Sequence, residues 1–125
     1  MGIWILYLIV TFSFPIFEIA YGSIYRDKVP KNINGGNGYK TAMSRLNRDT
    51  WEFANRYYNK LMRFFGWVLL ALSFVAAILI HGRDDNTLNL FMGILIALHI
   101  TAHLGCMVPT ENALRKTFDK NGHRR

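Results

Sequence analysis

Three long apolar segments alternate with polar segments along this chain. Residues 2–24 contain a single charged residue, Glu18, and residues 64–82 and 87–110 contain no Asp, Glu, Lys or Arg. A hydrocarbon core of about 30 Å is crossed by roughly 20 apolar residues in a helix, and a soluble helix would keep a polar face that these segments lack. The pattern predicts an all-α integral membrane protein with three transmembrane helices, at about residues 2–24, 64–82 and 87–109.

The basic residues are concentrated in two of the polar segments. Residues 26–63 hold nine Lys and Arg, residues 110–125 hold five, and the link at residues 83–86 holds one beside two acidic residues. Because cytoplasmic segments retain Lys and Arg, we expect the amino terminus outside, a cytoplasmic loop at residues 25–63 and a cytoplasmic tail at residues 110–125. Residues 1–125 would then form a single membrane domain. The net charge of +7 is expected to face lipid head groups, which argues against a nucleic-acid partner.

The expected cytoplasmic loop divides into two halves of different character. Residues 29–41 are rich in Asn and Gly and contain Pro30, so an irregular linker is predicted. Asp49 and Glu52 form a pair similar to a capping box, which places a helix start at this point. Apolar residues follow on one face at three- and four-residue steps, namely Trp51, Ala54, Tyr58, Leu61 and Phe65. This pattern predicts an amphipathic cytoplasmic helix leading into the second span, either lying at the head groups or docking on a partner.

Polar side chains stand out within the first and third spans. His99, His103 and Cys106 recur at four- and three-residue steps, so they share one stripe of the third helix. Glu18 lies about as far from the expected cytoplasmic end of the first span as His103 does from that of the third. Because polar groups in hydrocarbon usually face the protein interior, we hypothesise that Glu18 contacts His103, with His99 as a further candidate, through a shared proton or hydrogen bond. A structural contact is the favoured interpretation, with a ligand pocket, a proton-sensitive switch and a metal site as alternatives.

Metal, cofactor and enzyme functions find little support in the sequence. Three ligands on one helix, such as His99, His103 and Cys106, reach tetrahedral zinc geometry poorly, so no metal is expected. Residues 35–41 lack the Gly that directly precedes Lys in phosphate-binding loops. No serine has an evident base, and no two carboxylates share a helix face. We expect no cofactor and no enzymatic activity.

Two separated motifs carry a resemblance to a known family. In the loop the matching residues are Pro30, Asn32, Gly38, Tyr39, Lys40, Thr41, Ser44, Asn47, Thr50, Trp51, Ala54 and Asn55. In the tail they are Thr110, Glu111, Leu114, Lys116, Phe118, Asp119 and Gly122. Together with three spans in the expected places, they resemble the SdpI family of small bacterial membrane proteins. Lys40 stands where the family usually has Arg, and it keeps the charge without the planar bidentate fork.

The resemblance implies a class of function and the partners that go with it. It suggests immunity against a secreted killing peptide, combined with signalling, in the bacterial cytoplasmic membrane. The spans would then meet a hydrophobic peptide toxin in the lipid bilayer, and the loop and tail motifs would bind a cytoplasmic protein. The alternative is a subunit of a homo-oligomeric small transporter, with a proton or ion path through Glu18, His99 and His103.

Overall fold

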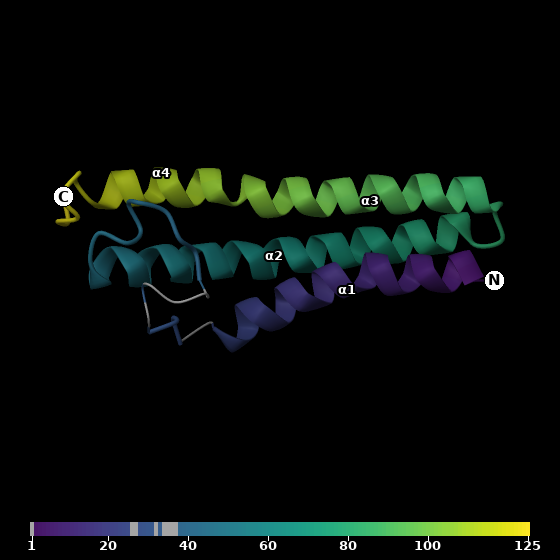
Figure 1. Cartoon of the computed structure of the whole chain (residues 1–125), viewed down its shortest axis with the longest axis horizontal. Coiled ribbons are helices and arrows are strands. Elements are labelled where there is room, and N and C mark those ends of the chain that lie inside the picture. The colour runs from purple at the N-terminus through teal and green to yellow at the C-terminus, as the bar shows by residue number, and fades with distance from the viewer. Residues whose placement is uncertain (1, 26–27, 32, 34–37) are drawn as a thin grey trace.

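The computed structural model describes residues 2–25, 28–31, 33 and 38–125, and these residues form four helices (Figure 1). The helices are α1 (Gly2–Ile24), α2 (Arg48–Ile80), α3 (Asp85–Gly105) and α4 (Met107–Thr117). In Figure 1, α1 and α2 lie side by side, and α3 and α4 follow one another along α2. Three segments are long and apolar enough to cross a membrane, namely Gly2–Ile24, Arg48–Ile80 and Asp85–Thr117. The predicted all-helical fold with three membrane-spanning helices is confirmed.

The second helix is longer than the predicted span. It runs for 33 residues from Arg48 to Ile80, so the predicted loop helix and the second span form one continuous helix. Its N-cap is Asn47, whose side chain accepts a hydrogen bond from the Thr50 backbone N–H at 2.9 Å, while Thr50 Oγ1 accepts from the Asn47 N–H at 3.1 Å. The predicted capping pair of Asp49 and Glu52 is therefore wrong. The amide of Asn47 caps the helix two residues earlier, and the Thr50 hydroxyl returns the second bond.

The third span also continues past its predicted end. The sequence places that end at Pro109, but α4 includes Pro109 and extends to Thr117, so the expected tail begins as a helix. The interruption falls at Cys106, between α3 and α4. A proline cannot donate to the carbonyl four residues before it, and its ring crowds that carbonyl. Within the first turn of a new helix, however, the missing N–H costs little, and the chain therefore breaks briefly and resumes.

Two glycines allow α1 and α2 to pack closely. A Cβ atom built on Gly66 would lie 2.8 Å from Ile19 Cγ1, and one built on Gly22 would lie 2.8 Å from the Asn59 carbonyl oxygen. Gly93 has open space at the same position. Small residues allow close backbone approach where membrane helices pack, so Gly22 and Gly66 define the contact between the first two spans.

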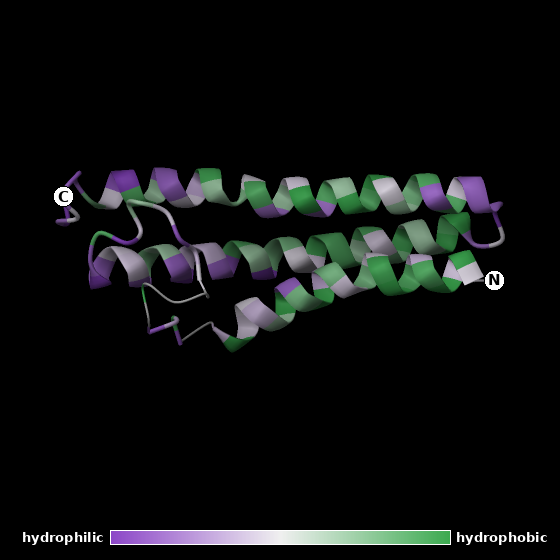
Figure 2. Ribbon diagram, in the orientation of Figure 1, coloured by the Kyte–Doolittle hydropathy of each residue, from purple (hydrophilic) through white to green (hydrophobic). Residues whose placement is uncertain are grey.

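Apolar and polar residues separate along the bundle. In Figure 2 the middle of α1, α2 and α3 is mostly green, whereas purple residues gather at the two ends. Large apolar side chains such as Ile9, Leu79 and Val108 are more than 60% exposed, at 63%, 66% and 62%. In water this surface would be unfavourable, but in a bilayer lipid chains cover it. We use "basic end" for the end of the bundle that carries residues 38–47, the start of α2, α4 and residues 118–125 (Figure 1).

Candidate functional site

Asn55 attaches the described part of the loop to α2. Its side-chain Oδ1 accepts a hydrogen bond from the Tyr39 N–H at 2.7 Å. Its Nδ2 donates to the Tyr39 carbonyl oxygen at 3.4 Å and to the Trp51 carbonyl oxygen at 3.0 Å. The Asn55 side chain is fully buried. One amide thus satisfies both backbone groups of Tyr39, as a neighbouring strand would in a sheet.

Trp51 and Gly38 complete this attachment. The Trp51 indole N–H donates to the Pro30 carbonyl oxygen at 2.6 Å, and the indole is fully buried. Gly38 has a positive φ of 106°, and a Cβ atom there would lie 2.8 Å from Asn55 Oδ1 and 2.9 Å from Trp51 Cη2. Only glycine fits this conformation and this space. Asn32, which the resemblance also includes, lies outside the described residues.

Ser44 and Thr41 fold the next segment into a turn. Ser44 Oγ accepts from the Thr41 N–H at 2.8 Å, and Thr41 Oγ1 accepts from the Ser44 N–H at 3.1 Å. The hydroxyl of Thr50, in the first turn of α2, lies 3.1 Å from the Ser44 carbonyl oxygen and bonds to it. Reciprocal side-chain bonds of this kind stabilise turns. The turn therefore delivers the chain to the N-cap of α2 in a fixed orientation.

The carboxyl-terminal tail is fastened to the same helix start. Asn47 Nδ2 donates to the Gly122 carbonyl oxygen at 2.8 Å, and Arg124 forms two 2.8 Å hydrogen bonds with the Asp49 carboxylate. Asp119 Oδ1 accepts the backbone N–H groups of His123 at 3.0 Å and Asn121 at 2.9 Å. These bonds, that of His123 foremost, lower the pKa of Asp119. The tail is therefore part of the folded basic end.

Tyr39 connects the loop to α4. Its ring is buried in an apolar cluster that includes Leu114, Phe118 and Tyr58. Its hydroxyl donates to Glu111 Oε1 at 2.7 Å. Burial of the ring, followed by the bond and the charge of Glu111, raises the pKa of Tyr39, so the hydroxyl keeps its proton. The loop motif and the tail motif thus meet in one packed unit.

Most of the residues that the resemblance assigns to partner binding have internal roles. The polar atoms of Ser44, Asn47 and Asn55 bond to the chain itself, and the side chains of Trp51 and Phe118 are fully buried. Their expected contact with a cytoplasmic protein stays a prediction. Any such contact would use the surface that these residues build rather than their own side chains.

Replacing Asn47 with alanine tests the cap and the tail attachment together. We expect the free energy of unfolding to fall by about 1–2 kcal/mol, because the helix loses its cap and the Gly122 carbonyl loses a donor. Titration with sodium dodecyl sulfate in mixed micelles measures this change. Asn112→Ala is the matched control, because Asn112 is exposed on α4. Equal effects of the two substitutions would contradict the assigned role of Asn47.

Glu18 and His99 are buried polar residues that line one cavity between α1 and α3. Glu18 is 5% exposed and His99 is 2% exposed. Glu18 Oε2 and His99 Nε2 have no hydrogen-bond partner within the described part of the chain. The cavity has a volume of about 280 Å³, and its walls are otherwise mostly apolar. We call it the α1/α3 cavity; its lining residues are Phe14, Phe17, Glu18, His99, Ile100, His103 and Leu104.

His103 lines the same cavity but does not bond to Glu18. Its side chain is exposed, and the Tyr58 hydroxyl lies 3.2 Å from His103 Nε2 and donates to the His103 carbonyl oxygen at 3.2 Å. The hypothesised hydrogen bond between Glu18 and a histidine is therefore absent from the contacts of the described residues. The sequence predicted a similar depth for Glu18 and His103, and both residues do line one cavity. Depth alone, however, does not determine how a helix is rotated about its axis, and the rotation decides which side chains can bond.

Cys106 does not form a metal site with the two histidines. Its buried side chain belongs to the apolar cluster at the basic end, with Ala54, Tyr58 and Met62. Within the described residues, no group of three or more His, Cys, Asp or Glu side chains is placed to hold a metal ion. The hypothetical set of His99, His103 and Cys106 is thus not assembled into a coordination site.

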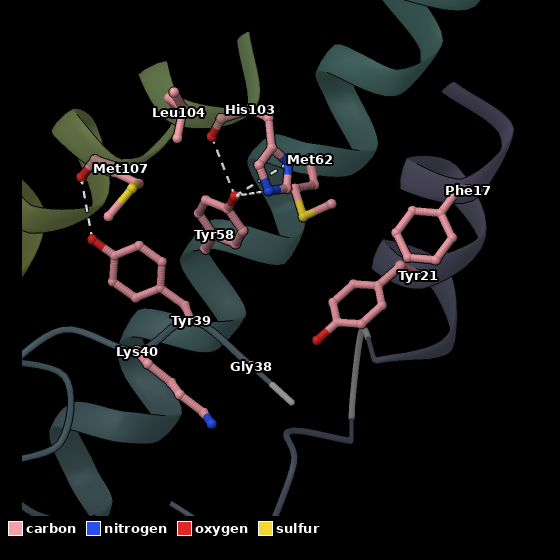
Figure 3. Close-up of a pocket in the computed structure, with 10 residues that line it drawn as sticks. All are labelled: Phe17, Tyr21, Gly38, Tyr39, Lys40, Tyr58, Met62, His103, Leu104 and Met107. Carbon is pink, nitrogen blue, oxygen red and sulfur yellow. Dashed lines mark hydrogen bonds between the residues drawn. The ribbon is translucent and has the colours of Figure 1, made fainter. Parts of the chain in front are cut away.

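A second hollow lies at the basic end, where α1, α2 and the α3–α4 break meet. Figure 3 shows Tyr39 and Tyr58 on one side, Phe17 and Tyr21 on the other, and Lys40 at the edge. Its volume is about 410 Å³. We call it the tyrosine pocket; it is lined by Phe17, Tyr21, Gly38, Tyr39, Lys40, Tyr58, Met62, His103, Leu104 and Met107. Sequence reasoning did not identify this pocket, because its residues come from four separate segments and no pattern within one segment indicates that the four meet.

The loop motif except for Pro30, together with the two later spans, falls within a region that matches a protein family. Residues 31–110 match the SdpI/YfhL protein family. This range covers most of the loop, all of α2 and α3, and the start of α4, which is more than half of the 125-residue chain. No curated protein and no solved structure matches the chain. The resemblance to the SdpI family is thereby confirmed. Of the tail motif only Thr110 lies within the matched residues, so the match does not test the rest of that motif.

Proposed function

Because this chain belongs to the SdpI/YfhL protein family, we propose that it is an immunity or signalling module of the bacterial cytoplasmic membrane. In this proposal the amino terminus lies outside and the basic end lies in the cytoplasm. The spans bind a hydrophobic peptide toxin, and the basic end binds a cytoplasmic protein. The excess of Lys and Arg in residues 26–63 and 110–125 supports the orientation.

The observation that carries the proposal is the α1/α3 cavity. Several of its apolar side chains are exposed on the surface that faces lipid, including Phe17 at 62%, Ile100 at 52% and Leu104 at 57%. At its inner wall, Glu18 Oε2 and His99 Nε2 lack partners among the described residues. A peptide within the bilayer carries polar groups that water cannot solvate. The cavity offers such a peptide apolar contact and hydrogen-bonding groups at one place.

The folded basic end supports the second half of the proposal. Tyr39 and Glu111 link the loop to α4, and α4 follows α3, which forms one wall of the cavity. A peptide bound in the cavity would move α1 relative to α3. Because α4 follows α3 and bonds to the loop through Tyr39 and Glu111, this movement would also shift the loop and the tail. A cytoplasmic protein bound to the loop and tail surface would respond to that motion.

Substitution of the two unpartnered residues tests the proposal. Bacteria sensitive to a secreted killing peptide would express the wild-type chain or Glu18→Leu, His99→Phe or Thr101→Val variants. We expect wild type to raise survival, and we expect Glu18→Leu and His99→Phe to reduce that protection about tenfold, because each removes a buried hydrogen-bonding group. Thr101 is exposed on α3, bonds to the Ala97 carbonyl oxygen and does not line the cavity, so Thr101→Val is the control. Unchanged protection by all three variants at equal membrane abundance contradicts the cavity-centred mechanism.

The second candidate is a subunit of an oligomeric transporter with a proton or ion path. Glu18, His99 and His103 line one cavity, and unpartnered ionisable groups inside a membrane often mark such paths. Proton flux into liposomes that contain the purified protein distinguishes the two functions. A transporter would show flux that Glu18→Leu abolishes, whereas an immunity module would show no flux and would still protect cells.

A further inference from the structure

We propose that the tyrosine pocket binds one anionic phospholipid from the leaflet at the basic end. Its phosphate would lie between Lys40 and the Tyr21 hydroxyl, and its acyl chains would lie over Phe17 and Leu104. This site adjoins the α1/α3 cavity and shares Phe17, His103 and Leu104 with it. Its polar groups differ, because Lys40 and Tyr21 line only the tyrosine pocket, whereas Glu18 and His99 line only the α1/α3 cavity.

The pocket lies at the depth where lipid head groups meet the hydrocarbon core. Its walls come from the last turns of α1, from the part of α2 just before the uncharged segment 64–80, and from the α3–α4 break. Tyrosines are typical of this depth, because their rings sit in apolar surroundings and their hydroxyls reach polar groups. The volume of about 410 Å³ is within the range of small-ligand sites.

The charges around the pocket favour an anionic ligand. Lys40 lines it, and no carboxylate is among the lining residues. Within the described part of the chain, Lys40 takes part in none of the salt bridges, which join Arg48 to Glu52, His123 to Asp119 and Arg124 to Asp49. The Glu111 carboxylate, which bonds to the wall residue Tyr39, accepts the hydrogen bond of the Tyr39 hydroxyl. A lysine binds a phosphate group well as a point charge, and it does so more strongly where water is partly excluded.

The apolar edge of the pocket suits the chains of a lipid better than a soluble phosphate compound. Phe17 and Leu104 line the pocket and are 62% and 57% exposed, so they present apolar surface to the bilayer. Figure 3 shows Phe17 and Tyr21 facing Tyr58 and Met62 across the hollow, with Lys40 on the loop side. A ligand that fits both parts carries an anionic head and long apolar chains, which is the chemistry of phosphatidylglycerol.

Native mass spectrometry of the full chain in detergent micelles tests this site with phosphatidylglycerol as the probe. We expect one bound phosphatidylglycerol, held at least about fivefold more tightly than phosphatidylcholine. Lys40→Gln should lower phosphatidylglycerol binding about fivefold, while Lys40→Arg should retain it. Lys116→Gln is the matched control, because Lys116 is exposed on α4 and does not line the pocket. Leu104→Trp should also weaken binding, because the larger side chain covers the apolar edge.

The outcomes separate the lipid from other occupants. Circular dichroism and size-exclusion elution equal to wild type establish that each variant is folded. Equal binding by wild type and Lys40→Gln, or equal binding of phosphatidylglycerol and phosphatidylcholine, overturns the proposal. Displacement of the lipid by millimolar glycerol phosphate also overturns the proposal, because the site would then bind a soluble anion. Binding of a hydrophobic peptide in place of the lipid overturns it too, because the site would then bind a protein segment.

Discussion

Replacing Gly38 with alanine is expected to lower the free energy of unfolding by roughly 3 kcal/mol. The φ angle of 106° at this position disfavours any side chain, and the new Cβ atom would meet Asn55 Oδ1 at 2.8 Å and Trp51 Cη2 at 2.9 Å. To relieve that contact, Asn55 must give up its bond to the Tyr39 N–H, which leaves buried polar groups unpaired. Titration with sodium dodecyl sulfate measures the loss, and limited proteolysis should cut the loop earlier than in wild type.

Gly82→Ala provides the control for backbone strain alone. Gly82 also has a positive φ, at 80°, but a Cβ atom there would have nothing within 4 Å. The free energy of unfolding of this variant should fall by only about 1 kcal/mol, which is the cost of placing alanine in the left-handed conformation. If the two alanine variants are destabilised equally, the close packing of Gly38 against Asn55 and Trp51 does not hold in solution.

A second large effect is expected at the contact of α1 and α2. Gly66→Leu should destabilise the protein by roughly 3 kcal/mol, because the added side chain must occupy space that Ile19 and Glu18 already fill. A Cβ atom at this position would already lie 2.8 Å from Ile19 Cγ1 and 3.2 Å from Glu18 Cβ. The first span would be pushed off the second, and the α1/α3 cavity would lose one of its walls. Unfolding in mixed micelles measures the destabilisation.

Gly93→Leu is the matched substitution on the third span. A Cβ atom at Gly93 has nothing within 4 Å, so the leucine would extend into lipid without displacing another residue. Its stability should equal or slightly exceed that of wild type, because leucine favours helix more than glycine does. A comparable loss at both positions would argue that α1 does not pack on α2 through Gly66.

These structural roles change how variants of the loop motif are interpreted. Trp51 and Asn55 hold the loop on α2 through buried hydrogen bonds. Their substitution removes the folded surface, so a loss of activity would not distinguish a lost partner contact from a lost fold. Lys40 is the more informative position, because Lys40 lines the tyrosine pocket and is only partly buried.

The sequence predicted the spans well because lipid imposes a simple constraint. Segments such as residues 64–82 carry no charge over a full crossing, and helix is the conformation that satisfies their backbone there. Helix ends were predicted less accurately. Asn47 and Asp49 both have side chains that can cap a helix, and the choice of Asn47 also satisfies the Gly122 carbonyl, a contact 75 residues away in the chain. No local pattern contains that information.

The candidate sites were harder to predict than the helix ends, because they depend on more contacts between residues that are distant in the sequence. The spacing of His99 and His103 placed both on one stripe, yet His99 is buried and His103 is exposed beside Tyr58. The role of Asn55 required the position of Tyr39, which approaches α2 from an irregular loop. Motif resemblance identified these residues as a group, but only the structure separates those that form the fold from those, such as Lys40, that line a pocket.

Labelling of single cysteines with a membrane-impermeant maleimide tests most directly whether the chain crosses the membrane three times with its basic end inside the cell. In a Cys106→Ser background, cysteines would be placed at Arg45, Asn86 and Lys120, which are all exposed. On intact cells we expect labelling at position 86 alone, with positions 45 and 120 labelled only after lysis. Labelling of position 45 or 120 on intact cells would contradict the account.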